Sequence, residues 1–496
     1  MRRSPLILAA LLIPAVAPLT YPGFIRTLAT FLPTYRVADW TWNPLSEGGF
    51  LACWLGSLLC RAGLPGPEAV KAIWALSLVL AGTGVFLQSC KEGPMVALLA
   101  SLLYVYSPFV LAVIYVKGEL AEPLFWGLFP WLLAALSWDK RDPWASLAAL
   151  FVFFLLLMAH PGLAIFALMA GLACGAIYRR WTFLPLSLPS LWAFFALNRG
   201  ILLEPNEEFF AHFVLPFQLF SAWWGVKASS PGWIEEMPFQ LGVVPLTLAF
   251  LALPGWAKVR DREGNLALAL AITPVILVMP IASTFWKLTH SWKLLRYPWE
   301  ILGFAALGLA LLGGFSLKYI PSLKDWPVWA GLAILALLGS YRYLEPEFVP
   351  FTPRYEPLAV IGNDNAILVE CEIKGKPAPG SGLEIELLWQ ALRPFDRDYS
   401  IFVHLLDAQG KKWAQRDQPP LNGERPTSSW APGELLKDRY PMVLGPDLPQ
   451  GPFSLAVGIY RWDTGERLKV RGREDGQAVI PLELCRGWEG TSGSGQ

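Results

Sequence analysis

The stretch AVIYVKGELAEPLFWGLFPWLLAAL, residues 112–136, places a short group of charges between two long apolar runs. The charged residues are Lys117, Glu119 and Glu122. A charge at the centre of a bilayer is costly, so such groups lie at a membrane surface or in a protected cavity. The pattern therefore predicts a helical hairpin with a polar tip. That tip is either a site for a charged ligand or an ordinary hydrated loop, and the sequence favours neither.

The composition points to a membrane protein. The chain has 496 residues, of which 54% are hydrophobic and only 16% are charged. Soluble proteins carry about 25% charged residues. Long apolar stretches recur through residues 1–341, which predicts a polytopic helical membrane domain with a different domain after it. The net charge of +1, with no basic patch, argues against a nucleic-acid partner.

The apolar stretches predict roughly eleven membrane crossings of about 20 residues each. The N-terminal apolar run follows Arg2 and Arg3 and has no convincing cleavage site, so we expect an uncleaved first helix that starts inside. Short loops rich in Lys, Arg and Asp then lie inside, and long aromatic, acidic loops lie outside. The expected location is the plasma membrane, with a cytoplasmic N-terminus and an extracytoplasmic C-terminal domain. An even number of spans would reverse the last assignment.

The composition changes near residue 342. Residues 342–355 form a Pro-rich linker, residues 356–487 alternate short apolar runs with turns, and the tail 488–496 is expected to be disordered. Several short strands at this spacing predict an all-β sandwich. The expected strands lie within residues 366–373, 383–392, 399–407, 440–445, 453–462 and 478–484.

The six cysteines fall into two groups. Four of them lie in or beside expected membrane helices, where buried thiols usually just pack. Cys371 lies in the first expected strand and Cys485 directly follows the last one, and the two are candidates for a disulfide if that domain is extracytoplasmic. No CxxC pair or HExxH motif is present, so no metal ligand set is predicted. The need for a cofactor, including a divalent cation, stays open.

Ionisable residues recur at the outer ends of the expected spans, and we expect them to meet in one cavity near that surface. Such a cavity suits chemistry on a lipid-linked substrate, because a Lys or Arg can hold the carrier phosphate while a carboxylate activates an acceptor hydroxyl. The residues are Asp39, Lys117, Glu119, Glu122, His160, His212, His290, Lys293, Arg296 and Glu300.

Each candidate also has a structural interpretation. Asp39 can cap a helix or turn, and His160 stands at the end of an expected span, where a histidine is more often structural. Arg296 and Glu300 are four residues apart and can pair with each other. Glu122 is the stronger catalytic candidate of the tip, because it begins an apolar span and is costly to bury without a role. The Trp-rich outer loops are either an interfacial belt or a sugar-stacking surface.

Three segments resemble a known family. They are YVKGELAEPLFWGLFPWLLAAL (115–136), LLMAHPGLAIFAL (156–168) and WKLLRYPWEILGFAALGLALLGG (292–314). They resemble motifs of the 6-pyruvoyl-tetrahydropterin synthase-related bacterial membrane proteins, which look like GT-C glycosyltransferases of the family 39 type. The C-terminal stretch is similar to a β domain that often follows such membrane parts.

The resemblance implies a GT-C-like fold and sugar transfer from a polyprenyl-phosphate carrier to a glycan or protein acceptor. Membrane lipid is a further expected partner. By position, Lys117 takes the place of the family's Arg, Glu122 its Glu and His160 its His. Glu300 stands where the family has an Arg, with Arg296 nearby as a substitute. The main departure is that TYPGFIRTL, after the first helix, lacks the usual acidic residue, and Asp39 comes late.

Two hypotheses follow. In the first, the chain is a glycosyltransferase in which Asp39 or Glu122 is the base, Lys117 and Arg296 hold the carrier phosphate, and Glu119, His160 and Glu300 complete the substrate site. In the second, the site is degenerate and the β domain binds glycan or another cell-envelope protein. A transporter is a weaker alternative, because few charges lie within the spans and no inverted repeat is evident.

Overall fold

The chain divides into two compact units, Met1–Val349 and Pro350–Gln496, and each is described on its own. The structure is a computed structural model. It describes residues 4–21, 25–27, 49–138, 143–179, 187–188, 207–226, 229, 232–233, 237–346, 348, 357–362, 365–430, 434–449 and 451–487.

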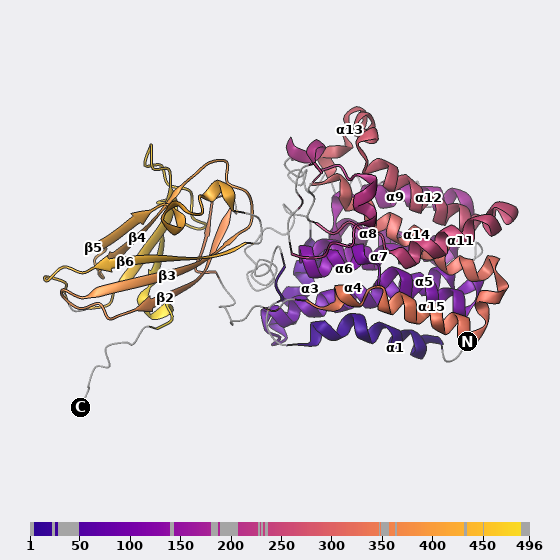
Figure 1. Cartoon of the computed structure of the whole chain (residues 1–496), viewed down its shortest axis with the longest axis horizontal. Helices are drawn as coiled ribbons and strands as arrows, with labels where there is room; N and C mark the ends of the chain where they lie inside the picture. Colours follow the sequence, from indigo (N-terminus) through magenta and orange to yellow (C-terminus); the bar gives the residue numbers. More distant parts are fainter. Residues whose placement is uncertain are drawn as a thin grey trace. The chain divides into compact units, whose positions relative to one another are not determined.

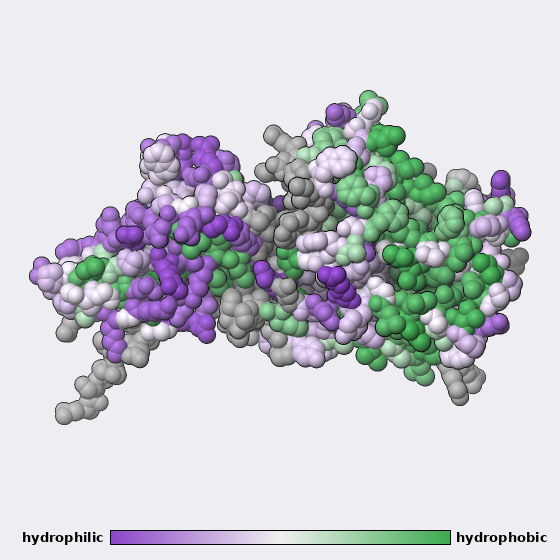
Figure 2. All heavy atoms as spheres, in the orientation of Figure 1, coloured by the Kyte–Doolittle hydropathy of each residue, from purple (hydrophilic) through white to green (hydrophobic). Residues whose placement is uncertain are grey.

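The first unit is built from helices that run mostly side by side (Figure 1). Figure 2 shows a broad hydrophobic surface over these helices, whereas hydrophilic side chains cover much of the second unit. The helices are α1 (Ser4–Val16), α3 (Phe50–Arg61), α4 (Gly66–Ser89), α5 (Pro94–Val105), α6 (Pro108–Ala112), α7 (Ala121–Ser137), α8 (Pro143–Ala159), α9 (Pro161–Tyr178), α11 (Val243–Val259), α12 (Arg262–Leu277), α13 (Ser283–Thr289), α14 (Leu302–Tyr319) and α15 (Trp326–Leu338).

Within the described residues, three helices are long and apolar enough to cross a membrane: Gly66–Glu92, Pro161–Tyr178 and Pro298–Tyr319. Two bent helix pairs raise the number to five if each pair is one span. The sequence predicted roughly eleven crossings. The apolar helices are therefore confirmed, but the described residues do not establish that number.

The centre of the helical unit is α14, which packs against α5, α11 and α12. Every residue from Leu302 to Leu317 is buried. A helix that is apolar on all sides is expected at the core of a large bundle. Gly308 allows the close approach to α12, because a Cβ atom there would lie 2.3 Å from the backbone nitrogen of Ala271.

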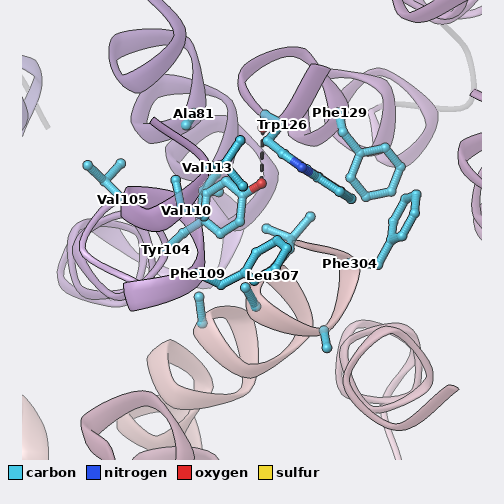
Figure 3. Packing of buried hydrophobic residues seen from close by; sticks show 14 of the residues in the cluster. Ala81, Tyr104, Val105, Phe109, Val110, Val113, Trp126, Phe129, Phe304 and Leu307 are labelled. Carbon is cyan, nitrogen blue, oxygen red and sulfur yellow. Dashed lines mark hydrogen bonds between the residues drawn. The ribbon is translucent and has the colours of Figure 1, made fainter. Parts of the chain in front are cut away.

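An aromatic layer joins α7 to α14 (Figure 3). The ring of Phe304 lies edge-on to the rings of Trp126 and Phe129, with centroids 4.8 and 4.7 Å away. The Tyr104 hydroxyl donates to the carbonyl of Trp126 at 3.0 Å, so this buried phenol is satisfied. Trp126 stands one helical turn after Glu122, so the layer fixes the part of α7 that carries this carboxylate.

Prolines break two stretches that the sequence analysis treated as continuous spans. The expected span 94–116 bends by 43° between α5 and α6, just before Pro108, because a proline disfavours helical geometry in the preceding residue. The carbonyl of Tyr106 accepts instead from the Ser340 hydroxyl at 2.6 Å. The expected span 266–283 ends as a straight helix at Leu277, and the chain then turns by 83° into the helix Pro280–Thr289.

The second unit contains two four-stranded antiparallel sheets, ordered β1-β2-β3-β6 and β5-β4-β7-β8. Side chains from both sheets enter one hydrophobic core, as expected for a β-sandwich. Cys371 in β2 forms a disulfide with Cys485, 114 residues later. The strands are β1 (Ala359–Ile361), β2 (Ala366–Lys374), β3 (Gly382–Ala391), β4 (Ser400–Leu406), β5 (Lys412–Gln418), β6 (Leu435–Val443), β7 (Ser454–Tyr460) and β8 (Ala478–Pro481).

Two strands, β1 and β5, were not anticipated from the sequence. The β5 sequence, KWAQRDQ, is polar because this strand lies at the edge of its sheet and pairs only with β4 among the described strands. A polar edge strand carries little of the alternation from which strands are predicted. The expected tail 488–496 and most of the expected linker 342–355 lie outside the described residues.

Candidate active site

The corner between α6 and α7 brings Lys117 and Glu122 face to face. Residues Val113–Lys117 form a π-helical turn, a local geometry found frequently at functional sites. It ends at Gly118, whose φ of 71° is in the left-handed region that favours glycine. A Cβ atom at Gly118 would lie 2.1 Å from the hydroxyl oxygen of Thr27, so this position has no room for a side chain.

Three carboxylates surround the Lys117 ammonium. Its Nζ atom contacts Glu122 Oε1 and lies 3.5 Å from Glu119 and 3.6 Å from Glu300. It also lies 5.1 Å from the centroid of the Trp299 ring, within the range of a cation–π interaction. Lys117, Glu122 and Glu300 are 5%, 0% and 2% exposed. We call Lys117, Glu119, Glu122, His160 and Glu300 the carboxylate cluster.

One oxygen of this cluster has no hydrogen-bond partner among the residues that the structure describes. Glu122 Oε2 is buried and makes no hydrogen bond to any described residue. Leaving a buried polar atom unpaired costs about 1–3 kcal/mol, and such atoms are rare in folded proteins. The cost has a functional explanation if a ligand supplies the missing partner.

Glu300 reaches the cluster from the short helix Pro298–Ile301, which leads into α14. Its Oε2 atom accepts a hydrogen bond from the Arg296 backbone nitrogen at 3.3 Å. The Arg296 guanidinium lies over the ring of Tyr297, 5.4 Å from its centroid. Arg296 and Glu300 are therefore joined through the backbone amide, and the guanidinium is placed beside the cluster.

His160 has two roles in the structure. It caps the N-terminus of α9, because its Nδ1 atom accepts from the Leu163 backbone nitrogen at 3.2 Å. It also belongs to the cluster, since ligand atoms of Glu122, His160 and Glu300 all lie within 4.8 Å of one another. His160 is therefore a helix cap, as its structural interpretation predicted, and it also lies beside the two buried carboxylates.

This trio could in principle hold a metal ion, but the histidine fits a different role. Because Nδ1 accepts the Leu163 N–H, the proton of the neutral ring is on Nε2. A metal would need the lone pair of Nε2, and binding it would sacrifice the cap hydrogen bond. Lys117 already places a cation among the same carboxylates. The geometry therefore favours a ligand that accepts from His160 Nε2–H and donates to Glu122 Oε2, as a hydroxyl group does.

A second group of side chains contacts Trp299 and its neighbour Tyr297, and the sequence analysis did not predict most of these residues. The Trp299 indole N–H donates to the Ser229 hydroxyl oxygen at 3.2 Å, and this oxygen lies 2.8 Å from His212 Nδ1. The His212 ring packs against Tyr297 at a centroid distance of 4.8 Å. His212 was among the expected outer groups, but no local sequence pattern pointed to Ser229.

The structure thus brings together six of the predicted site residues: Lys117, Glu119, Glu122, His160, Arg296 and Glu300. Their burial excludes the hydrated-loop alternative for Lys117 and Glu122, while Glu119 stays partly exposed and its carbonyl accepts from the Trp74 indole at 2.9 Å. Asp39, the other catalytic candidate, lies outside the described residues.

Comparison with known protein families and with characterised proteins finds no match to this chain.

Proposed function

We propose that the helical unit is a membrane-embedded glycosyltransferase that moves a sugar from a polyprenyl-phosphate carrier to an acceptor at the outer face of the plasma membrane. The observation that supports this most directly is the buried, unpartnered Oε2 atom of Glu122. A carboxylate oxygen held in a low-dielectric site without a partner suits proton abstraction from a substrate hydroxyl.

In this proposal the acceptor hydroxyl lies between Glu122 and His160. Its oxygen accepts from His160 Nε2–H, and its proton points to Glu122 Oε2. As the oxygen attacks the sugar's anomeric carbon, Glu122 takes the proton and the bond to the carrier phosphate breaks. Lys117 fixes the other oxygen of Glu122, so the free oxygen keeps its direction.

The roles of the two cations differ from those in the first hypothesis from the sequence, in which both hold the carrier phosphate. A phosphate that approached Lys117 would meet Glu119, Glu122 and Glu300, so repulsion from three carboxylates opposes the attraction of one ammonium. Arg296 is partly exposed beside the cluster, and a guanidinium can bind phosphate with two parallel hydrogen bonds. We therefore assign the carrier phosphate to Arg296 and a positioning role to Lys117.

The proposal retains the membrane topology expected from the sequence, with roughly eleven crossings, a cytoplasmic N-terminus and an extracytoplasmic β unit. Short apolar helices such as Ser4–Thr20, Val243–Val259 and Trp326–Leu338 would supply the further crossings by locally thinning the bilayer. The disulfide between Cys371 and Cys485 supports the placement of the β unit, because disulfides persist in oxidising compartments outside the cytoplasm.

The test is sugar transfer by the purified full chain in nanodiscs, with radiolabelled polyprenyl-phosphate sugars as donors. Glu122→Gln keeps the shape of the side chain but removes the base, and Glu386→Gln, at an equally buried glutamate of the β unit, is the matched control. Asp39→Ala tests the other candidate base. Transfer that is lost in Glu122→Gln and retained in Glu386→Gln supports the assignment. Equal transfer in all variants would remove Glu122 and Asp39 as bases.

One observation favours the second candidate, a non-catalytic protein whose β unit binds glycan or an envelope protein. Trp462, next to β7, is 73% exposed, and an exposed indole is a common sugar-stacking group. If this candidate is right, the wild-type chain shows no transfer with any donor, whereas Trp462→Ala lowers the binding of the full chain to cell-wall glycans in a sedimentation assay.

A further inference from the structure

The helix Pro280–Thr289 presents a hydrophobic stripe outward. Ile281, Phe285 and Leu288 follow the i, i+4, i+7 spacing of one helix face. Ile281 and Leu288 are 80% and 76% exposed, and Phe285 is also exposed. A stripe with this spacing normally packs onto the protein, so its exposure in this short helix needs a partner.

A different side chain anchors this helix to the bundle. Trp286 is fully buried, and its indole N–H donates to the carbonyl of Leu277 at 2.8 Å. Its ring packs on Phe166 of α9 and on Phe209, with centroids 5.7 and 5.1 Å away. The attachment through Trp286 sets which face is presented outward, so the exposure of the stripe is a consequence of the fold.

The direction of the helix matches a bilayer surface. It is bent by 83° from α12, a 16-residue apolar helix that covers most of the expected crossing 266–283. An element nearly perpendicular to a crossing helix lies nearly parallel to the membrane plane. In Figure 1 the label α13 marks this element at the top, and Figure 2 shows both hydrophobic and hydrophilic side chains there.

The charges beside the stripe identify the kind of lipid. Lys287 and Lys293 are exposed, and each ammonium extends over an aromatic ring, 5.2 Å from Phe210 and 5.7 Å from Trp292. Apolar side chains beside cations are the pattern of helices that lie in the headgroup region of anionic membranes. Each lysine near such a surface is worth about a fivefold preference for anionic lipid.

We propose that Pro280–Thr289 is an interfacial helix that inserts Ile281, Phe285 and Leu288 among the acyl chains of an anionic bilayer while Lys287 and Lys293 bind lipid phosphates. This inference rests on the membrane setting of the proposed function but not on sugar transfer. It also gives the protein a fixed depth in the bilayer, because the helix is anchored to the bundle through Trp286.

The experiment places the photo-crosslinking residue benzoylphenylalanine at Leu288 of the full chain in nanodiscs of equal phosphatidylglycerol and phosphatidylcholine. The control carries it at Val443, an 85% exposed residue of the β unit. After irradiation, mass spectrometry should find at least ten times more lipid adduct at 288 than at 443. Equal labelling, or a cross-linked dimer of the chain in place of lipid, would overturn the proposal.

The lysines are tested in the same system. In Lys287→Gln/Lys293→Gln, the ratio of phosphatidylglycerol to phosphatidylcholine adducts at position 288 should fall about fivefold or more. An unchanged ratio would refute the anionic preference. The readout is lipid contact, so a failure of sugar transfer leaves this result interpretable, and a failure of lipid contact does not affect the transfer assay.

Discussion

Both units of this protein bury a glutamate completely, and the surroundings of the two carboxylates are opposite. In the helical unit, Glu119, Glu122 and Glu300 share the single ammonium of Lys117. In the β unit, three cations surround Glu386: Lys374 at 2.7 Å, Lys437 at 2.5 Å and Arg439 at 2.8 Å. Three carboxylates thus share one ammonium in the first cluster, whereas three cations surround one buried carboxylate in the second, where Lys374 and Lys437 also pair with Glu384 and Glu372.

The difference separates a candidate active site from a structural network. The cations around Glu386 are all about half-exposed or more. They lie within 2.8 Å of its two oxygens, so ion pairs compensate its charge although Oε2 makes no hydrogen bond among the described residues. Burial alone would raise the pKa of Glu386, but hydrogen bonds and charges from Lys374 and Lys437 outweigh it and lower the pKa to about 2. In the helical unit, by contrast, Glu122 Oε2 has neither a hydrogen bond nor a cation beside it among the described residues, so it can accept a hydrogen bond from a ligand.

The largest expected effect is on stability. Lys117→Met should destabilise the helical unit by about 3–5 kcal/mol, because it leaves buried carboxylates uncompensated. Lys374→Met is the control, and it should cost less than about 1 kcal/mol, because this lysine is half-exposed and two other cations remain at Glu386. Thermal unfolding in nanodiscs measures both. Equal losses in the two variants would show that the clusters do not differ in the way described.

The second effect is on activity. If Glu122 is the base, Glu122→Gln should lower sugar transfer by about 100-fold or more, the usual contribution of general base catalysis. Glu386→Gln removes an equally buried carboxylate from the β unit and should leave the transfer rate unchanged. A similar loss of rate in both variants would indicate that unfolding, and not catalysis, is responsible.

Two glycines test whether the close packing at Gly118 excludes a side chain there. Gly118 and Gly380 have almost the same φ, 71° and 73°. A Cβ atom at Gly118 would collide with Thr27, whereas no atom lies within 4 Å at Gly380. We expect Gly118→Ala to lower the free energy of unfolding by about 2–3 kcal/mol and Gly380→Ala to lower it by about 1 kcal/mol. At Gly380 the only cost is the strain of a left-handed backbone at a residue with a side chain. Equal melting temperatures for the two variants would contradict the close packing at Thr27.

The smallest effect is a pH dependence confined to the β unit. The pKa of Glu386 is lowered from 4.5 to about 2 on folding, so its stabilisation is present above pH 4.5 and is lost as the pH falls toward 2. We expect a loss of about 1–2 kcal/mol over this interval, as for a hydrogen-bonded charge. Hydrogen exchange of the β3 amides measures it in the full chain. Glu386→Gln should remove this part of the pH dependence, and a wild-type slope in this variant would refute the assignment.

Much of the architecture was predictable from local pattern. The apolar runs predicted helices, and the short alternating runs after residue 356 predicted strands, because both signals depend on nearby residues. Strand β5 was missed, because a polar edge strand needs no hydrophobic alternation. The bends before Pro108 and at Pro280 were also missed, although a proline marks each one, because the hydrophobicity continues across both.

For the candidate site, the sequence determined which residues carry charge next to apolar runs, and that was enough to select Lys117, Glu122, His160 and Glu300. Only the tertiary structure decided that α6, α7, α9 and the segment before α14 bring these groups within a few ångströms of one another. It also decided that Ser229 and His212 support Trp299, and that Lys117 faces carboxylates. The physical reason is that hydropathy is a property of each segment, whereas a buried charge is defined by its partners, and here those partners come from segments up to about 180 residues apart in the chain.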